Sequence, residues 1–343
     1  MAAKSAATLS LRRHAVLSLT TKFRLPHEGM ADLEYLSRGS AFLLDTKAGP
    51  KTTRSIGDIA VLTCQHVACP WLFPKYFADK WDWLQHVSEE FVVHSLQLLE
   101  LPPATPPPVL VSHHSPNDNE PSHHRQQQQV FVPRVLAEFP LERHVWLHPS
   151  RDVAMLALSD SIADVEWDAY AAGDWNLELL TLQARKTSVA AGDVLLFTGH
   201  KQFSSTELAV VGGGDAKAVG QYPKEVLGNF VGESSQGQAF AWSEEVLEEG
   251  MCGGAVVNTE GECVGLVEGI VPPFVDHSPA EPKQSADSES ESESVVAMRK
   301  ALANHVAFVP VKEIASFVEE KGSFVATGML LGLEDDDDDD ALW

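Results

Sequence analysis

Cys252 lies in the segment EEGMCGGAVVN (residues 248–258), with Gly250 before it and two glycines directly after it. Nucleophilic catalysis requires an activated nucleophile, a base in contact with it, and hydrogen-bond donors for the oxyanion. Glycines beside a nucleophile allow backbone conformations closed to other residues and let a substrate come close. We therefore expect Cys252 to be a nucleophile, with the amides of Gly250 and Cys252 binding the oxyanion. The alternative is a small buried residue in a tight turn.

Two further residues have the types and positions that such a nucleophile requires. His66 ends the apolar run VLTCQHV, so we expect it at the end of a strand, where a packed scaffold would fix it. Asp152 opens the apolar run DVAMLAL, and a carboxylate at the start of a buried strand is costly unless it is paired. Pairing with an imidazole would remove that cost and would orient the base. Considered alone, His66 is also explained as a structural residue, and Asp152 as a residue that caps a turn.

Six segments, in order along about residues 15–320, resemble the trypsin-like (chymotrypsin-fold) peptidases, most closely their intracellular HtrA/Deg-type branch. These segments are RGSAFLLD, AVLTCQHV, HPSRDVAMLAL, VAAGDVLLFTGH, GMCGGAVVNTEGECVGLVEGIV and HVAFVPVKEIASFVEE. The resemblance implies His66 as general base, Asp152 as its orienting carboxylate and Cys252 as nucleophile. It implies a trypsin-like endopeptidase that hydrolyses peptide bonds through an acyl-enzyme, with a polypeptide substrate and with no cofactor or metal.

The chain departs from that family at two positions of the nucleophile loop. Cys252 replaces the family's serine, as in viral chymotrypsin-like cysteine peptidases, and a neighbouring imidazole can lower the pKa of a thiol into an ion pair. Met251 stands where the family often has Asp or Asn, so we expect the oxyanion loop to be held differently. The competing interpretation is a catalytically inactive protein of the protease fold that binds peptides or serves as a scaffold.

Three further features have two interpretations each. Glu268 follows the apolar segment VGLV, at one wall of the family's specificity cleft, and is either a substrate-binding residue or a solvated charge. Cys64 precedes His66 by two residues and is expected to pack in the core, with a redox-sensitive neighbour as the alternative. Histidine pairs at 113–114 and 123–124 lack a recognisable set of further ligands, so we expect a low-complexity loop rather than a metal site.

Short apolar runs punctuated by turns predict an all-β protein, and the resemblance implies two six-stranded antiparallel β-barrels with a short C-terminal helix. The strands fall into two groups, at about residues 15–160 and 190–311. Helical spacing predicts helices over 76–101 and 311–320. The expected strands are 15–21, 39–45, 59–67, 130–140, 144–149, 152–159, 193–199, 207–213, 237–243, 254–258, 263–271 and 306–310.

The domain prediction follows from these groups and from compositional interruptions. Residues 15–160 form the first barrel, with an insertion at 74–129. Residues 161–320 form the second barrel, with an acidic insertion at 276–295. An acidic tail follows at 321–343. Residues 1–14 hold basic residues and no acidic one, which is typical either of a mitochondrial presequence or of a flexible N-terminus.

Charge and cysteine content restrict the partners and the compartment. The net charge of -24 would repel a phosphate backbone, so we expect no nucleic-acid partner. No apolar run is long enough to span a membrane. Four cysteines in 343 residues do not make a disulfide framework. We expect an intracellular protein, cytoplasmic or alternatively mitochondrial. No pattern in the sequence indicates an oligomeric state.

Overall fold

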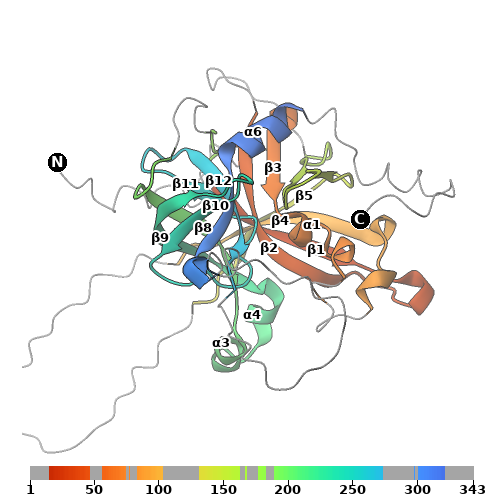
Figure 1. The fold of residues 1–343 in the computed structure, drawn as a ribbon. Helices are drawn as coiled ribbons and strands as arrows, with labels where there is room; N and C mark the ends of the chain where they lie inside the picture. Colours follow the sequence, from red (N-terminus) through yellow and green to blue (C-terminus); the bar gives the residue numbers. More distant parts are fainter. Residues whose placement is uncertain are drawn as a thin grey trace, which may run out of the picture.

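The computed structural model describes residues 15–46, 56–74, 77, 83–102, 131–162, 167, 177–182, 189–272, 297 and 300–320. A β-sheet formed by the first part of the chain lies beside a β-barrel formed by the second part (Figure 1). Four predictions lie outside the described residues: the presequence at 1–14, the histidine pairs, the acidic insertion at 276–295 and the acidic tail.

The first part of the chain forms a seven-stranded antiparallel sheet in the order β5-β4-β1-β2-β3-β7-β6. Its two sides approach each other beyond the ends of β5 and β7. There Leu141 pairs with Leu158, and the Glu142 amide donates to the Ala157 carbonyl at 2.9 Å. The strands are β1 Val16–Phe23, β2 Glu34–Asp45, β3 Ile59–Thr63, β4 Val92–Leu99, β5 Val135–Pro140, β6 Trp146–Leu147 and β7 Ala154–Leu156.

The second part of the chain forms a closed six-stranded barrel in the order β10-β13-β12-β11-β8-β9. The structure is therefore mostly β, as predicted, and the second barrel is confirmed. The first half differs from the expected six-stranded barrel, because the short strand β6 extends the sheet and only an isolated bridge links β5 to the β7 side. The barrel strands are β8 Val194–Gln202, β9 Gln221–Glu233, β10 Ala239–Ser243, β11 Ala255–Val257, β12 Cys263–Ile270 and β13 Val306–Pro310.

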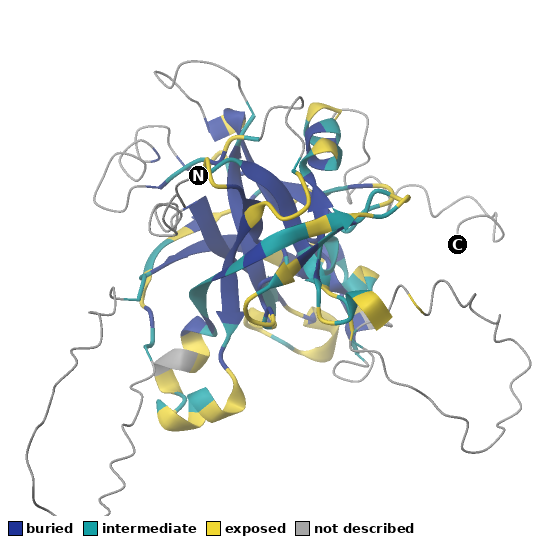
Figure 2. Cartoon of the chain, turned by 60° about the vertical axis from the view of Figure 1, so that its left-hand side comes forward, coloured by how far each residue is buried: buried dark blue, intermediate teal, exposed yellow. Residues whose placement is uncertain are grey.

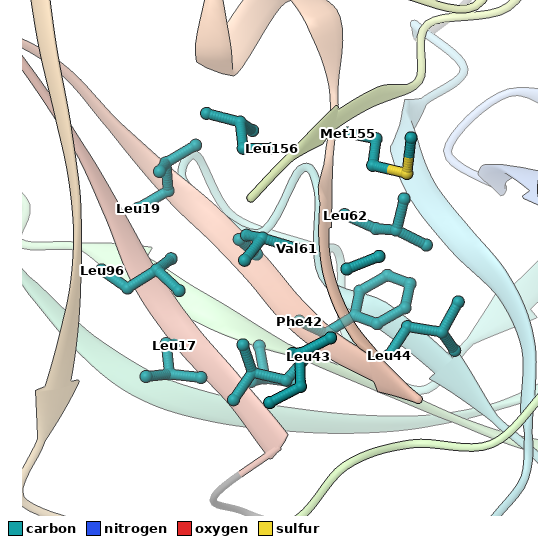
Figure 3. Close-up of a cluster of buried hydrophobic side chains, with 14 of the residues drawn as sticks. Leu17, Leu19, Phe42, Leu43, Leu44, Val61, Leu62, Leu96, Met155 and Leu156 are labelled. Atoms are coloured by element: carbon teal, nitrogen blue, oxygen red, sulfur yellow. The ribbon is translucent and has the colours of Figure 1, made fainter. Parts of the chain in front are cut away.

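A continuous apolar core joins the sheet to one side of the barrel. Leucine, valine and phenylalanine side chains of β1, β2, β3, β4 and β7 meet in its centre (Figure 3). The same cluster includes Leu266 and Val309 of the barrel. Helix α6, Val311–Glu319, adds Ile314 and Phe317 to it. Burying these side chains fixes the two halves against each other, and the buried ribbon segments run through both (Figure 2).

The helix predicted at 311–320 is confirmed by α6, but two other predictions are wrong. The segment predicted as a helix at 76–101 contains β4 and the 3-10 turns η6 Leu84–His86 and η7 Glu89–Phe91. Its leucines and valines also fit a strand, and pairing with β1 and β5 decides the outcome. The segment predicted as a strand at 207–213 is mostly helix α3, Ser205–Val210, because Ser204 and Glu207 form a capping box.

The longest strand, β9, was not predicted, since its glycines and charges interrupt any apolar run. The remaining short elements are η3 Pro26–Glu28, η4 Ile56–Asp58, α1 Gln65–Ala68, η5 Pro70–Leu72 and α4 Gly214–Val219. Among the described residues, no helix has both the length and the apolar character needed to cross a bilayer.

Candidate active site

His66 is positioned just beyond the end of β3. The strand ends at Thr63, Cys64 caps the N-terminus of α1, and His66 lies in the first turn of that four-residue helix. The neighbouring Gln65 side chain donates to the carbonyls of His148 (2.6 Å) and Val153 (3.2 Å). These two bonds hold α1 against the loop that carries Asp152.

Two hydrogen bonds connect His66 to Asp152. The Nδ1 atom of His66 lies 2.5 Å from Oδ2 of Asp152, and the His66 amide donates to Oδ1 of the same carboxylate at 3.1 Å. The side chains are 12% and 19% exposed, so little water competes for these bonds. The carboxylate therefore fixes the ring orientation and directs Nε2 away from itself.

A side-chain hydrogen bond also joins Cys252 to His66. Burial alone lowers the pKa of His66, but its hydrogen bonds to Asp152 and Cys252 outweigh burial and raise this pKa from an ordinary 6.5 to about 10. The imidazole is therefore protonated at neutral pH when an anionic sulfur faces it. The structure brings together the three residues that the sequence predicted, from segments far apart in the chain.

Cys252 is the one partly exposed cysteine among the four, all of which are free thiols within the described residues. Burial raises the pKa of the thiols of Cys64, Cys69 and Cys263. The Cys64 thiol also donates to the Val267 carbonyl at 3.2 Å. Buried thiols of this kind are poor nucleophiles, so reactivity is expected at Cys252 alone.

The backbone around Cys252 leaves two amides free for a ligand. Met251 N–H donates to the Glu248 carbonyl and Gly253 N–H to the Val267 carbonyl. Within the described part of the chain, the amides of Gly250 and of Cys252 have no protein acceptor. Gly250 has φ +96°, a left-handed conformation that glycine adopts without strain. Both residues line the cleft described below, so both amides are available to a ligand.

A cleft of about 1050 Å³ runs between the sheet and the barrel, and the three predicted residues line it. The sheet side contributes Tyr35, Arg38 and His66. The barrel side contributes Cys252 and Glu268. Cys252 lies on the wall of this cleft.

Glu268 is directed toward the site by a β-bulge. Val267 pairs with Phe308 and Gly269 with Ala307, so Glu268 is the unpaired extra residue of β12. Its Oε2 atom is buried and has no hydrogen-bond partner within the described residues. Burial and the nearby Asp152 carboxylate raise the pKa of Glu268. Glu268, the predicted substrate-binding residue, thus lines the cleft, but one of its carboxylate oxygens is buried beneath the cleft surface.

One group of side chains has the composition of a metal site. Ligand atoms of Cys64, His66 and Asp152 all lie within 4.8 Å of one another. Thiolate and imidazole are ligands that zinc prefers. However, Nδ1 of His66 is taken by Asp152 and the Cys64 thiol by the Val267 carbonyl. The prediction that the protein works without a metal stays a prediction.

Two residues that support the site were not found from the sequence. Gln65 joins the His66 and Asp152 segments, but a glutamine beside a histidine is not a signal by itself. Gly253 packs against the sheet so closely that a Cβ atom would lie 2.2 Å from the Ser40 carbonyl oxygen. The pair of glycines after Cys252 signalled a close approach, but not toward which strand.

The sequence matches no known protein-family model and no curated protein. The class of protein is therefore inferred from the fold and from the geometry of the site. A closed β-barrel beside an antiparallel sheet, with the side chains of Cys64, His66 and Asp152 close together, is compatible with a trypsin-like fold.

Proposed function

We propose that this protein is a trypsin-like cysteine endopeptidase. The observation that carries the proposal is the series of contacts from the Asp152 carboxylate, through His66, to the partly exposed Cys252. This series supplies an oriented base and an activated sulfur. The two unoccupied amides of Gly250 and Cys252 supply the third requirement, donors for a developing oxyanion.

The acylation step follows from these positions. The Cys252 thiolate, paired with protonated His66, attacks the carbonyl carbon of a peptide bond. The carbonyl oxygen becomes an oxyanion that accepts hydrogen bonds from the Gly250 and Cys252 amides. As the tetrahedral intermediate collapses, His66 gives its proton to the departing nitrogen, the C–N bond breaks, and a thioester remains on Cys252.

Deacylation uses the same groups in reverse. Neutral His66 takes a proton from water, whose oxygen attacks the thioester carbonyl. The same two amides bind the second oxyanion. When the C–S bond breaks, the thiolate leaves and is again paired with protonated His66. Asp152 stays ionised throughout and stabilises the imidazolium.

The architecture supports placing the chain in the trypsin-like peptidase fold. In that assignment, the seven-stranded sheet corresponds to the first barrel, and the bridge between Leu141 and Leu158 links its two sides without closing it. The cleft between the two halves is where the substrate would lie. The four free cysteines support a reducing intracellular compartment, cytoplasmic or alternatively mitochondrial. A polypeptide is the proposed substrate.

Reaction with a p-nitrophenyl ester of a short peptide tests the proposal, because acylation of Cys252 releases one coloured nitrophenolate per site. The burst is expected from the unaltered protein at neutral pH and is expected to be lost in Cys252→Ala and His66→Ala. Cys263→Ala is the matched control, since it removes a buried thiol that does not line the cleft. A reaction no faster than that of a free thiol, and indifferent to His66, would indicate the inactive peptide-binding alternative.

A further inference from the structure

The nucleophile loop is not held by the side chain that precedes the nucleophile. Met251 is 1% exposed and packs in the barrel core, in a cluster with Phe197 and Leu247. A thioether in an apolar cluster anchors the loop by packing and makes no strong hydrogen bond. Besides the hydrogen bonds within the loop, such as that from the Met251 amide to the Glu248 carbonyl, the loop peptides are held by a side chain of another element.

Ser40 of β2 provides this side chain from the opposite half of the molecule. Its hydroxyl donates to the Gly250 carbonyl at 2.7 Å and accepts from the His200 amide at 2.8 Å. Its own amide donates to the Cys252 carbonyl at 3.0 Å. Ser40 is completely buried, so water does not compete for these bonds. One residue of the sheet thus binds two carbonyl groups of the loop.

Those two carbonyl groups flank the peptide between residues 251 and 252, whose N–H group is the Cys252 amide proposed to bind the oxyanion. The Gly250 carbonyl belongs to the peptide between residues 250 and 251, and the Cys252 carbonyl to the peptide between 252 and 253. Because each peptide is planar, fixing both carbonyls restricts the Cα atoms at either end of the peptide between 251 and 252. The direction of the Cys252 N–H depends on that peptide.

We propose that Ser40 is a positioning residue for the amide of Cys252, one of the two proposed oxyanion donors. The inference rests on the proposed function and goes beyond it, since it assigns the orientation of this amide to a residue in the other half of the chain. It also explains how the loop keeps its shape with an apolar residue at position 251.

The surroundings of Ser40 fit this role. A Cβ atom added to Gly199 would lie 2.9 Å from the Ser40 hydroxyl and 3.2 Å from the Met251 Cα, so glycine there lets β8 lie close to both. Thr63 donates its hydroxyl to the Ser40 carbonyl at 2.7 Å. The hydrogen bond from Thr63 and the close packing of β8 therefore fix the position of Ser40.

Two reactions of Cys252 separate positioning of its amide from general support of the site. Alkylation by iodoacetamide displaces iodide from a carbon atom, forms no oxyanion and needs only the activated thiolate. Acylation by the peptide p-nitrophenyl ester needs the oxyanion donors as well. In Ser40→Ala, we expect the rate constant of the acylation burst to fall about 10-fold or more, with little change in the ester concentration that gives half its maximal value. The alkylation rate is expected to stay within about 2-fold of that of the unaltered protein, because the His66 contact remains.

The matched control is Ser18→Ala. Ser18 is also fully buried in the sheet and donates to the Gln221 side chain of the barrel at 2.6 Å, but it makes no bond to the nucleophile loop. Both rates should be unchanged in this variant. Thermal unfolding checks that each variant is folded, and Ser40→Cys, which keeps the size of the side chain and weakens its hydrogen bonds, replaces Ser40→Ala if the latter does not fold.

Equal acylation in Ser40→Ala and the unaltered protein would overturn the inference. So would a parallel loss of both reactions, which would make Ser40 a support of the whole site. If the unaltered protein shows no rapid alkylation at all, the proposed function fails first and the inference falls with it.

Discussion

The Asp152 carboxylate binds both the ring and the backbone of His66, through Nδ1 at 2.5 Å and the amide at 3.1 Å. A carboxylate that makes a single hydrogen bond can rotate about it. Two hydrogen bonds to the same residue fix the orientations of the carboxylate and of the imidazole ring. The hydrogen bond from the His66 amide also joins Asp152 to the first turn of α1, where backbone N–H groups have no helical acceptor. Charge and geometry at His66 therefore depend on the same side chain.

The first prediction concerns Asp152→Asn. The amide keeps the size of the side chain but lacks the negative charge that stabilises the imidazolium. We expect kcat/KM for a peptide ester to fall by about 100-fold or more. We also expect the alkylation of Cys252 by iodoacetamide at neutral pH to slow, because the His66 imidazolium loses the carboxylate that stabilises it. Steady-state kinetics and the rate of the iodoacetamide reaction measure the two effects.

Asp160→Asn is the control for this exchange. Asp160 is exposed, follows the same segment of the chain and does not line the cleft. Its replacement should leave both rates unchanged. Equal rates in Asp152→Asn and the unaltered protein would show that the pair of Cys252 and His66 needs no carboxylate partner.

The second prediction concerns the pH dependence of stability. The pKa of His66 is about 10 in the folded protein, against about 6.5 in an unfolded chain. The folded state therefore holds a proton that the unfolded state releases. The stability contributed by His66 is fully present below pH 6.5 and is lost as pH rises toward 10. The difference in the free energy of unfolding between the unaltered protein and His66→Gln should decrease across that range.

Urea unfolding at intervals of pH measures this difference, and other titrating groups largely cancel between the two proteins. An independent measurement is the NMR titration of the His66 ring proton, which should have its midpoint well above 6.5. A midpoint near 6.5 together with a flat stability difference would contradict the ion pair that the site geometry indicates.

The sequence indicated which residues line the cleft together better than it indicated the sheet that carries them. Cys252 and Asp152 adjoin short apolar runs that do form strands, and His66 follows one, so their local contexts were informative. The 76–101 segment was predicted wrongly because leucines and valines at helical spacing also fit a strand, and only the partners β1 and β5 decide between them. The role of Ser40 depends on contacts 210 residues apart along the chain, which no local pattern reveals.

The third prediction concerns Met251. Because this side chain is buried in the barrel core, Met251→Asp places a carboxylate among apolar groups without a partner. We expect a loss of about 3–5 kcal/mol in the free energy of unfolding. Met251→Leu keeps the volume and should cost less than about 1.5 kcal/mol. Urea unfolding measures both. A stable Met251→Asp protein with increased activity would reveal a polar partner for the acid and would show that the loop can use the arrangement of the family it resembles.

The last prediction concerns Gly253, the residue that follows Cys252, the proposed nucleophile. It has φ +83°, and a Cβ atom there would lie 2.2 Å from the Ser40 carbonyl oxygen and 2.4 Å from the Thr63 hydroxyl. Gly253→Ala therefore combines backbone strain with a collision against a rigid strand, and we expect a loss of about 2–5 kcal/mol in the free energy of unfolding.

Gly29→Ala separates the two contributions, because Gly29 has a similar φ of +79° and nothing within 4 Å of an added Cβ. It should cost only the backbone strain, about 1–2 kcal/mol. Because the collision pushes the loop away from β2, Gly253→Ala should also slow the acylation of Cys252, while Gly29→Ala should not. Equal losses in the two variants would mean that the loop moves freely away from the sheet, which is incompatible with a nucleophile held by contacts from both halves of the molecule.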